Sequence, residues 1–340
     1  MLAALNAAVP AVAVPAVAVL LLALWIDRRL GEPPAAAHPV VWMGHYLQRC
    51  GAFITRRGPV LAFVLGAVAW CGGAALVGSL AWACQALLLW QLSRVGHVSL
   101  TVGSLAWLGA ALLLVGVSWL LKTMLAWRML RSEALAVEYA LGESLEAARQ
   151  RLSWLVSRDT AELSASEVRE SAIESLAENL NDSVVAPLFW FVVFGLPGAA
   201  VYRFANTADA MWGYRGLRHG QNWEWAGKWA ARADDVLSWV PARLCALLVV
   251  ALTPGVAFHT LPMQARQTPS PNSGWPMAAM ALAVNIRLGK PGVYVLNPRG
   301  HSPQPLDTLK TIKKASNTVV AAVSIACVAI LLVAFLKALW

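Results

Sequence analysis

The chain has 340 residues, of which 59% are hydrophobic and only 13% are charged, and its mean hydropathy is +0.59. Soluble domains are typically about 45–50% apolar and about a quarter charged, so this composition excludes a chain with a single water-facing core and favours an integral membrane protein. Lys and Arg exceed Asp and Glu by 27 to 18; without a zinc-finger or RNA-binding pattern, loop charge and anionic lipid explain this excess better than nucleic acid does.

Four apolar runs are long enough to cross a membrane. A spanning helix needs about 20 apolar residues, and the runs that reach this length are 2–26, 60–90, 100–121 and 319–336. No Lys or Arg precedes the first run, whereas Arg28 and Arg29 follow it. The positive-inside rule therefore predicts an external N-terminus and cytoplasmic positions for 27–59 and 122–182.

Two further apolar stretches, 184–204 and 236–258, are interrupted. The first contains Pro187 and a Gly-Leu-Pro-Gly break at 195–198, and the second contains Pro241 and Arg243. An arginine near the bilayer centre costs at least about 2.5 kcal/mol. Each stretch fits either a span or a re-entrant hairpin buried in protein, and we expect at least one of them not to span.

The expected fold is all-α: one polytopic membrane-embedded domain, 1–340, with about 4–6 membrane-embedded helices and re-entrant segments. Its predicted parts are N-terminal transmembrane helices (1–121), a helical cytoplasmic region (122–183), embedded or re-entrant segments with polar motifs (184–258), a polar loop (259–317) and a C-terminal transmembrane helix (318–340). Region 122–182 is expected to hold two helices. Region 253–317 is rich in Pro, Gly, Ser and Asn, which is typical of loops.

A row of carboxylates in region 122–182 is the sharpest chemical signal. Ser164 and Glu167 have the spacing of a capping box, which predicts a helix start. Beyond it, apolar residues recur every four positions on one face, and the opposite face carries an acidic row: Glu170, Glu174, Glu178 and Asp182. Because these charges repel each other, a cation should lie on them. Mg²⁺ is favoured, since it binds carboxylates and bridges them to phosphates; a salt-bridged partner helix and plain solvation are the alternatives.

The turn Arg158-Asp159-Thr160 precedes this helix. It is either capping chemistry or the position of an arginine fork for phosphate. Beside the 195–198 break, Asn206 and Asp209 share one helix face. They are either functional or caps for broken backbone, because polar groups near a membrane segment are costly without partners.

Arg243 lies inside an apolar run, so it should have an anionic partner. The candidates are Asp234, Asp235 or a substrate carboxylate. The pair Asp234-Asp235 itself lies beside basic residues and fits either an ion-pair network or a metal and phosphate site.

Several short segments occur in a particular order along the chain: Asp27-x-x-x-Gly31-Glu32-Pro33-Pro34, His38-Pro39-Val40, Ser157-Arg158-Asp159-Thr160, Glu174-Ser175-x-Ala177-Glu178-Asn179-x-x-Asp182, Asn206-Thr207-x-Asp209-x-Met211-x-Gly213-Tyr214, Asp234-Asp235, Pro241-Ala242-Arg243-Leu244, Ser270-Pro271-Asn272-x-Gly274-Trp275-Pro276, Arg287-Leu288-Gly289 and Tyr294. In this order they resemble the adenosylcobinamide-phosphate synthase family of cobalamin biosynthesis, over most of the chain. The chain departs from the family pattern at Ser183, Leu282 and Lys290, where the family has Gly, and at Met277, where it has Glu.

The resemblance implies an enzyme of the inner, cytoplasmic membrane, with its active face in the cytoplasm. It would join a propionate carboxyl of adenosylcobyric acid to aminopropanol or its O-phosphate, with ATP and Mg²⁺. Other implied partners are membrane lipid, a second copy of the chain or later cobalamin-assembly enzymes. A non-catalytic membrane sensor of the same fold and a corrinoid transporter are the alternatives; the first would lack amide-synthase activity, and the second would move corrinoids into vesicles.

The resemblance also implies three sets of site residues. The catalytic residues are Arg158, Asp159, Thr160, Asn179, Asn206 and Asp209; the substrate-binding residues are His38, Tyr214, Arg215, Arg243, Ser270 and Asn272; the metal ligands are Glu174, Glu178, Asp182, Asp234 and Asp235.

Overall fold

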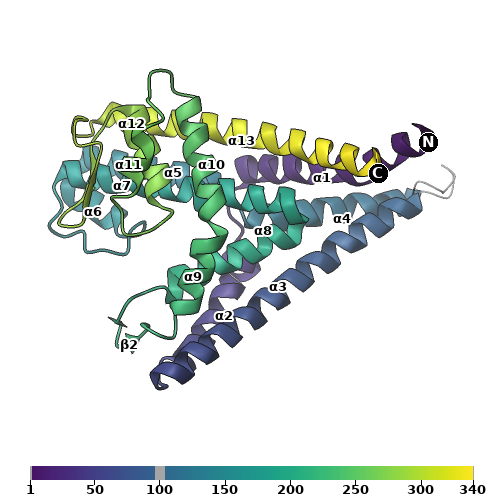
Figure 1. Ribbon diagram of the computed structural model, residues 1–340, viewed down its shortest axis with the longest axis horizontal. Coiled ribbons are helices and arrows are strands. Elements are labelled where there is room, and N and C mark those ends of the chain that lie inside the picture. The colour runs from purple at the N-terminus through teal and green to yellow at the C-terminus, as the bar shows by residue number, and fades with distance from the viewer. Residues whose placement is uncertain (1, 96–103, 340) are drawn as a thin grey trace. The chain divides into compact units, whose positions relative to one another are not determined.

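The computed structural model describes residues 2–95 and 104–339 and is almost entirely helical (Figure 1). The described chain forms two compact units, each assembled from segments that are distant in sequence. Unit 1 comprises Met1–Ala126, Pro187–Leu237 and Val323–Trp340; unit 2 comprises Trp127–Ala186 and Ser238–Ala322.

Unit 1 contains the long apolar helices near the N-terminus. Its elements are α1 (Leu2–Leu30), the 3₁₀ turn η1 (Ala35–Ala37), α2 (Pro39–Ile54), α3 (Pro59–Val95), α4 (Ser104–Thr123), nearly all of α8 (Ala186–Trp212), the two-residue strands β1 (Leu217–Arg218) and β2 (Gln221–Asn222), and α9 (Lys228–Leu237). Helix α4 packs against α1 and α3, and α3 also packs against α2 and α9. The C-terminal part of α13 (Pro305–Leu339) belongs to this unit as well.

Unit 2 contains the polar segments. Its elements are α5 (Trp127–Glu143), α6 (Leu145–Leu152), α7 (Ala165–Leu180), the π-helical turn η2 (Asn181–Val185), α10 (Trp239–Ala251), α11 (Thr260–Ala265), α12 (Gly274–Val284), the antiparallel strands β3 (Leu288–Lys290) and β4 (Tyr294–Leu296), and the start of α13. Helix α12 packs against α10, α11 and α7, and β3 packs against α7.

Four helical stretches of the described chain are long and apolar enough to cross a membrane: Pro59–Val95 (α3), Leu105–Glu143 (α4 and α5), Ala165–Trp212 (α7, η2 and α8) and Pro305–Lys337 (α13). Large apolar side chains stay exposed along α3, among them Val60, Val68, Leu80 and Trp82, as expected for surfaces that lipid solvates. The chain is therefore an all-α polytopic membrane protein, as its composition predicts. The predicted run 2–26 forms part of α1, which is not one of these four helices, and residues 100–103 of the predicted run 100–121 lie outside the described residues.

Three expectations about helix positions were wrong. Region 122–182 holds three helices, α5 to α7, and not two. The predicted loop 259–317 contains α11, α12, the β3–β4 hairpin and the first turns of α13. The Pro and Gly content of this region predicted a loop, although the region contains the apolar helix α12, which is almost wholly buried. The third difference is the start of the C-terminal helix, because α13 begins at Pro305 and not at the predicted residue 318. The missing backbone N–H of a proline is tolerated at a helix start.

The interrupted stretches take different forms. Helix α8 is kinked at the predicted break, where two helical stretches meet at Gly195, whose φ of +69° and ψ of −156° only glycine adopts readily. The backbone N–H of Leu196 donates to Gln85 Oε1 at 2.7 Å, so a side chain of α3 satisfies a group that the break releases. In the second stretch, α10 has 13 residues, which is shorter than the roughly 20 residues of a span.

A buried ion-pair network joins α1, the following loop and α4 in unit 1. Lys122 is fully buried; its Nζ lies 2.6 Å from Glu32 Oε2 and 3.6 Å from Asp27 Oδ1. His38 Nε2 lies 3.1 Å from the same Glu32 oxygen, and His38 Nδ1 accepts the Val40 N–H as the N-cap of α2. Burial by itself raises the pKa of Glu32, but the hydrogen bonds of His38 and Lys122 outweigh burial and hold this pKa below its usual value.

Replacing Lys122 with Met is expected to lower the free energy of unfolding by about 3–5 kcal/mol, because Asp27 and Glu32 keep their buried charges without a cation. Thermal unfolding in detergent, followed by circular dichroism, measures the loss. Lys313→Met, at an exposed position of α13, is the matched control, and equal melting temperatures for the two variants would contradict the assignment.

The difference in free energy of unfolding between wild type and Lys122→Met should depend on pH. Because the pKa of Glu32 is lowered in the folded chain, its charge stabilises the fold above its ordinary pKa of 4.5, and this contribution is lost as pH falls through the folded-state value. The difference in free energy of unfolding between wild type and Lys122→Met should therefore become smaller at acidic pH.

Candidate active site

Helix α7 begins with the predicted capping box. Ser164 Oγ accepts the Glu167 N–H at 3.3 Å, and Glu167 Oε2 accepts the Ser164 N–H at 2.8 Å. The predicted apolar face is also present, since Val168 and Ala172 pack in a buried cluster with Val137, Ala148 and Leu152 of α5 and α6. The start and the orientation of α7 therefore follow the sequence pattern.

The opposite, acidic face of α7 is covered by protein, so plain solvation does not explain it. Glu170 is 3% exposed and Glu174 is 5% exposed. Arg158 Nη2 lies 3.2 Å from Glu174 Oε2, and Arg287 Nη2 lies 3.4 Å from Glu170 Oε1. Salt bridges therefore account for these two carboxylates, but the cations come from a turn and from the segment before β3, not from the predicted partner helix.

Helix α7 passes into the π-helical turn η2 after Leu180, so the last member of the predicted acidic row, Asp182, lies in a wider helical turn than Glu170, Glu174 and Glu178. Asn181 Nδ2 donates to Asp182 Oδ1 at 2.8 Å, and η2 packs against α10. The continuation of the acidic row to Asp182 stays a prediction.

A small pocket of about 190 Å³ lies beside the Arg158–Glu174 pair, and we refer to it as the Arg158 pocket. Its chemically active lining consists of Arg158, Glu174, Glu178, Asn179, Lys290 and Tyr294. Predicted catalytic residues and predicted metal ligands of unit 2 therefore share one pocket. Met277 also lines it, so two positions that depart from the family pattern, Met277 and Lys290, face the same space.

Tyr294 is a pocket residue to which no role was assigned from the sequence. Its hydroxyl lies 3.9 Å from Met277 Sδ. Burial, followed by the charge of Glu174, strongly raises the pKa of Tyr294, so the hydroxyl stays protonated at neutral pH and is available as a donor. Tyr294 belongs to the ordered segments that resemble the family, but no local pattern shows that it lies beside a glutamate more than a hundred positions earlier.

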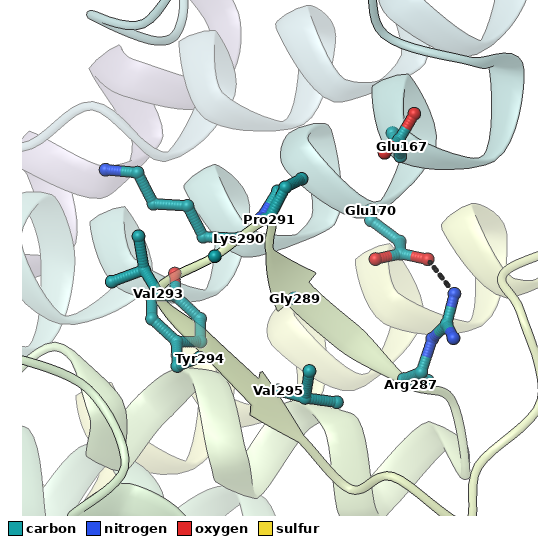
Figure 2. Close-up of a pocket in the computed structure, with 10 residues that line it drawn as sticks. Glu167, Glu170, Arg287, Gly289, Lys290, Pro291, Val293, Tyr294 and Val295 are labelled. Atoms are coloured by element: carbon teal, nitrogen blue, oxygen red, sulfur yellow. Dashed lines mark hydrogen bonds and ion pairs between the residues drawn. The ribbon is translucent and has the colours of Figure 1, made fainter.

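The β3–β4 hairpin separates the Arg158 pocket from a second pocket of about 370 Å³. The second pocket is lined by Glu167, Glu170 and Arg287 together with hairpin residues 289–295 (Figure 2). Lys290 and Tyr294 line both pockets. In Figure 2 the Lys290 side chain extends away from the Glu170–Arg287 pair.

The side chains of Asp159 and Thr160 stabilise the turn that contains Arg158. Asp159 Oδ1 accepts the Ala161 N–H at 3.0 Å, and Thr160 Oγ1 donates to the Arg149 carbonyl at 3.0 Å. The Arg158 guanidinium instead donates to Ser171 and Glu174 of α7.

Arg243 has a different environment from the one expected. Within the described chain no carboxylate pairs with it; Nη1 donates to the Trp239 carbonyl at 2.6 Å and to Asn272 Oδ1 at 3.2 Å. Its guanidinium also lies over the rings of Trp239 and Trp275, at 4.1 and 4.7 Å from their centroids. Within the chain, oxygen acceptors and π-faces surround the guanidinium, while an anionic substrate partner stays a prediction. The arginine also holds the loop in which Ser270 Oγ accepts the Asn272 N–H.

The remaining predicted site residues belong to unit 1. Tyr214 donates to the Ala210 carbonyl at 2.8 Å, and its ring is covered by Arg218. Burial raises the pKa of Asp235, and the nearby charges of Arg232 and Arg215 partly offset this rise. Asn206 and Asp209 share the last turns of α8, as their spacing predicts. Since these residues and Arg158 lie in different units, the gathering of all of them around one cytoplasmic cavity stays a prediction.

The described residues contain no group of three or more His, Cys, Asp or Glu side chains that could hold a metal ion. Mg²⁺ often needs only one or two carboxylates, because water and phosphate complete its shell. Glu174 fits this role poorly, since it is 5% exposed and Arg158 already contacts its Oε2. Glu178, Asp234 and Asp235 are compatible with it.

Fold and pocket together define the class: an all-α polytopic membrane protein with a small, densely charged pocket beside a helix of buried carboxylates. The model of the family described as CobD/Cbib protein matches residues 20–334, and the chain belongs to that family.

Curated relatives agree over most of their length. A probable cobalamin biosynthesis protein CobD from Methanothermobacter thermautotrophicus is 38% identical over 318 residues, covering 89% of this chain and 94% of the relative. Cobalamin biosynthesis proteins CobD from Dehalococcoides mccartyi and Chromobacterium violaceum are 34% and 38% identical, covering 82% and 79% of this chain and 85% and 80% of the relatives. No solved structure matches the chain.

Replacing Arg287 with Gln should loosen the β3–β4 hairpin, because the buried Glu170 then loses its cation. A loss of about 1–3 kcal/mol is expected for one charged group left without its hydrogen bond. Hydrogen–deuterium exchange of residues 288–296 measures the effect, with Arg299→Gln at an exposed neighbouring position as the control. Unchanged exchange in Arg287→Gln would show that the pair does not hold the hairpin.

Proposed function

We propose that this chain joins a propionate carboxyl of adenosylcobyric acid to aminopropanol or aminopropanol O-phosphate, with hydrolysis of ATP. Membership of the CobD/Cbib family gives it a role in cobalamin biosynthesis. The amide-forming reaction goes beyond that role. It is supported chiefly by one observation: the Arg158 pocket gathers arginine, lysine, carboxylates, an amide and a tyrosine in a space suited to a small polar substrate.

The proposed chemistry follows from the poor leaving group of a carboxylate. In the first step a carboxylate oxygen attacks the γ-phosphorus of ATP, and ADP leaves, which gives an acyl phosphate. In the second step the amine nitrogen attacks the acyl carbon, the C–O bond breaks, and inorganic phosphate leaves with its electron pair. The amine must lose its proton before or during this attack, and a carboxylate at the site can accept it.

In this proposal Arg158 offsets phosphate charge in both steps. A guanidinium presents its N–H donors in a planar fork that matches phosphate oxygens, which the point charge of lysine does not reproduce. Ser171 and Glu174 hold Arg158 Nη2, so the orientation of the fork is set before substrate arrives and costs no reordering.

Mg²⁺ supplies charge neutralisation of the ATP phosphates when it is bound. We assign its protein ligands to Asp234 and Asp235 on α9 rather than to Glu174. The basic side chains Arg215 and Arg232 interact with Asp235, so this segment offers both carboxylates for a cation and arginines for phosphate oxygens. The site is proposed to face the cytoplasm, where ATP is available.

Purified protein incubated with adenosylcobyric acid, aminopropanol phosphate, ATP and Mg²⁺ should form adenosylcobinamide phosphate, together with one ADP per amide bond. Mass spectrometry of the corrinoid and an ADP assay measure both products. Corrinoid flux into vesicles without any product would favour the transporter, and neither activity would favour a sensor.

Arg158→Lys should lower kcat/KM about tenfold or more, because losing one charge-assisted hydrogen bond costs about 1.5–3 kcal/mol. The protein should stay folded, since a lysine ammonium can still neutralise Glu174. Arg131→Lys, at an exposed position of α5, is the control. A lower melting temperature with unchanged kinetics would leave Arg158 with a structural role only.

Asp235→Asn should raise the Mg²⁺ concentration that gives half-maximal activity, by about tenfold, if this carboxylate contacts the ion. Titration of Mg²⁺ after chelation with EDTA measures the shift in wild type and variant. Glu143→Gln, at an exposed position of α5, should leave the Mg²⁺ requirement unchanged, and the same shift in both variants would defeat the assignment.

A further inference from the structure

Unit 1 contains a pocket that the proposed reaction does not use. Its volume is about 490 Å³, within the range of about 300–1,000 Å³ that accommodates drug-sized ligands. The pocket lies between α1, α3, α4, α8 and the C-terminal part of α13 (Figure 1), and all of its lining residues belong to unit 1. None of these residues has a role in the proposed reaction, so a different ligand has to be considered for it.

Most walls of this pocket are apolar and buried. The lining side chains that are 8% exposed or less are those of Ala13, Val19, Leu88, Val117, Phe191 and Ile330. On one side the walls continue into Val193 and Phe194 of α8, which are 47% and 62% exposed. Lipid rather than water surrounds the exposed apolar surface of a membrane-embedded helix, so an acyl chain can enter this pocket from the bilayer.

Lys337 is the one charged residue among the described residues that line the pocket. It is exposed in the last turn of α13, and within the described chain its ammonium group makes no hydrogen bond or ion pair. A lysine near the end of an apolar helix extends toward the lipid headgroups. Because no carboxylate of the described chain lines the pocket, Lys337 gives it a positive charge, which attracts an anionic headgroup.

Gln85 of α3 provides a second polar group to the pocket. Its Oε1 accepts the Leu196 N–H at 2.7 Å, at the break in α8, so the orientation of the amide group is fixed. The two N–H groups of Nε2 make no hydrogen bond within the described chain. Amide donors without an acceptor are costly in apolar surroundings, and the ester carbonyl of a lipid would accept one of them.

We propose that this pocket binds one anionic glycerophospholipid from the surrounding bilayer. The lipid phosphate binds the ammonium group of Lys337, an ester carbonyl accepts an N–H of Gln85, and an acyl chain packs against the apolar walls. The bound lipid thereby joins the break in α8 to α1, α3, α4 and the end of α13. Its role is structural: it stabilises unit 1 in the membrane and takes no part in the proposed reaction.

The test compares defined lipids on the whole chain after delipidation in detergent. Native mass spectrometry counts bound molecules of phosphatidylglycerol, phosphatidylethanolamine and diacylglycerol, and thermal unfolding measures the stabilisation that each lipid gives. The two variants are Lys337→Met, which removes the exposed cation, and Ala334→Phe, which fills the pocket from α13. The matched controls are Arg94→Met and Ala75→Phe, at exposed positions of α3 that do not line the pocket.

Wild-type protein should bind one phosphatidylglycerol about fivefold more tightly than either other lipid, as expected for one basic residue at an anionic headgroup. Diacylglycerol has no phosphate, and the ammonium group of phosphatidylethanolamine meets no carboxylate in the lining that the structure describes. Lys337→Met should weaken phosphatidylglycerol about fivefold and leave diacylglycerol unchanged. Ala334→Phe should remove all three lipids, whereas both control variants should behave as wild type.

Wild-type protein that holds no lipid molecule at one-to-one stoichiometry would overturn the proposal. Unchanged binding of phosphatidylglycerol to Lys337→Met would overturn it as well, because the occupant would then be a neutral lipid. An equal loss in Lys337→Met and Arg94→Met would show that surface charge in general attracts the headgroups, and would contradict the assignment. Unchanged binding to Ala334→Phe would also contradict it, because the lipid would then lie outside the pocket.

A second copy of the chain is the competing occupant of the pocket. A wild-type dimer that persists without lipid, and that Ala334→Phe dissociates, would assign the pocket to a contact between copies and overturn the lipid. Substrates are absent from all of these measurements, so failure of the proposed reaction would leave their result unaffected.

Melting temperatures measured without lipid control for loss of fold. If Ala334→Phe is unstable, Ala16→Phe fills the pocket from α1 instead. The exposed position of Lys337 allows its substitution without repacking, so Lys337→Met decides the headgroup assignment in either case.

Discussion

The placement of two carboxylates in the interior of unit 2 is the constraint on which the site depends. Glu170 and Glu174 lie one helical turn apart on α7 and are almost fully buried. A buried carboxylate without a cation costs several kcal/mol, so α7 requires Arg287 and Arg158 at its acidic face. These two arginines lie on opposite sides of α7 in the sequence, and each brings a segment with it: the turn before α7, and the chain that leads into the β3–β4 hairpin.

The β3–β4 hairpin therefore contributes side chains to the site as well as connecting α12 to α13. It brings Lys290 and Tyr294 to α7, and both side chains line the two pockets that flank it. The apolar helix α12 packs beneath it against α7 and β4, and it contributes Met277 to the same lining. A charged pocket in a membrane protein thus depends on a small piece of β-structure, because a short hairpin can place successive side chains on both of its faces.

Unit 1 follows the membrane constraint that every backbone group must find a partner away from water. The break at Gly195 releases a backbone N–H, and the side chain of Gln85 accepts it. The Lys122 network obeys the same rule for charge: Asp27, Glu32 and His38 surround one buried lysine and tie α1, the following loop and α4 together. In both places a polar residue in an apolar helix has a specific structural partner, which is why its presence there is tolerated.

The sequence by itself determined the class of fold, the start and apolar face of α7, the break in α8 and the family. These follow from local properties: run length, helical period, capping spacing and the backbone freedom of glycine. Only the tertiary structure decided which cation serves which carboxylate. Arg158 was expected either to serve its own turn or to bind phosphate, and it contacts Glu174 of α7. Arg243 was expected to need an anion, and within the chain it is held by oxygen acceptors and two tryptophan rings. Such pairings depend on contacts between segments distant in the chain, whose free energies a local pattern does not contain.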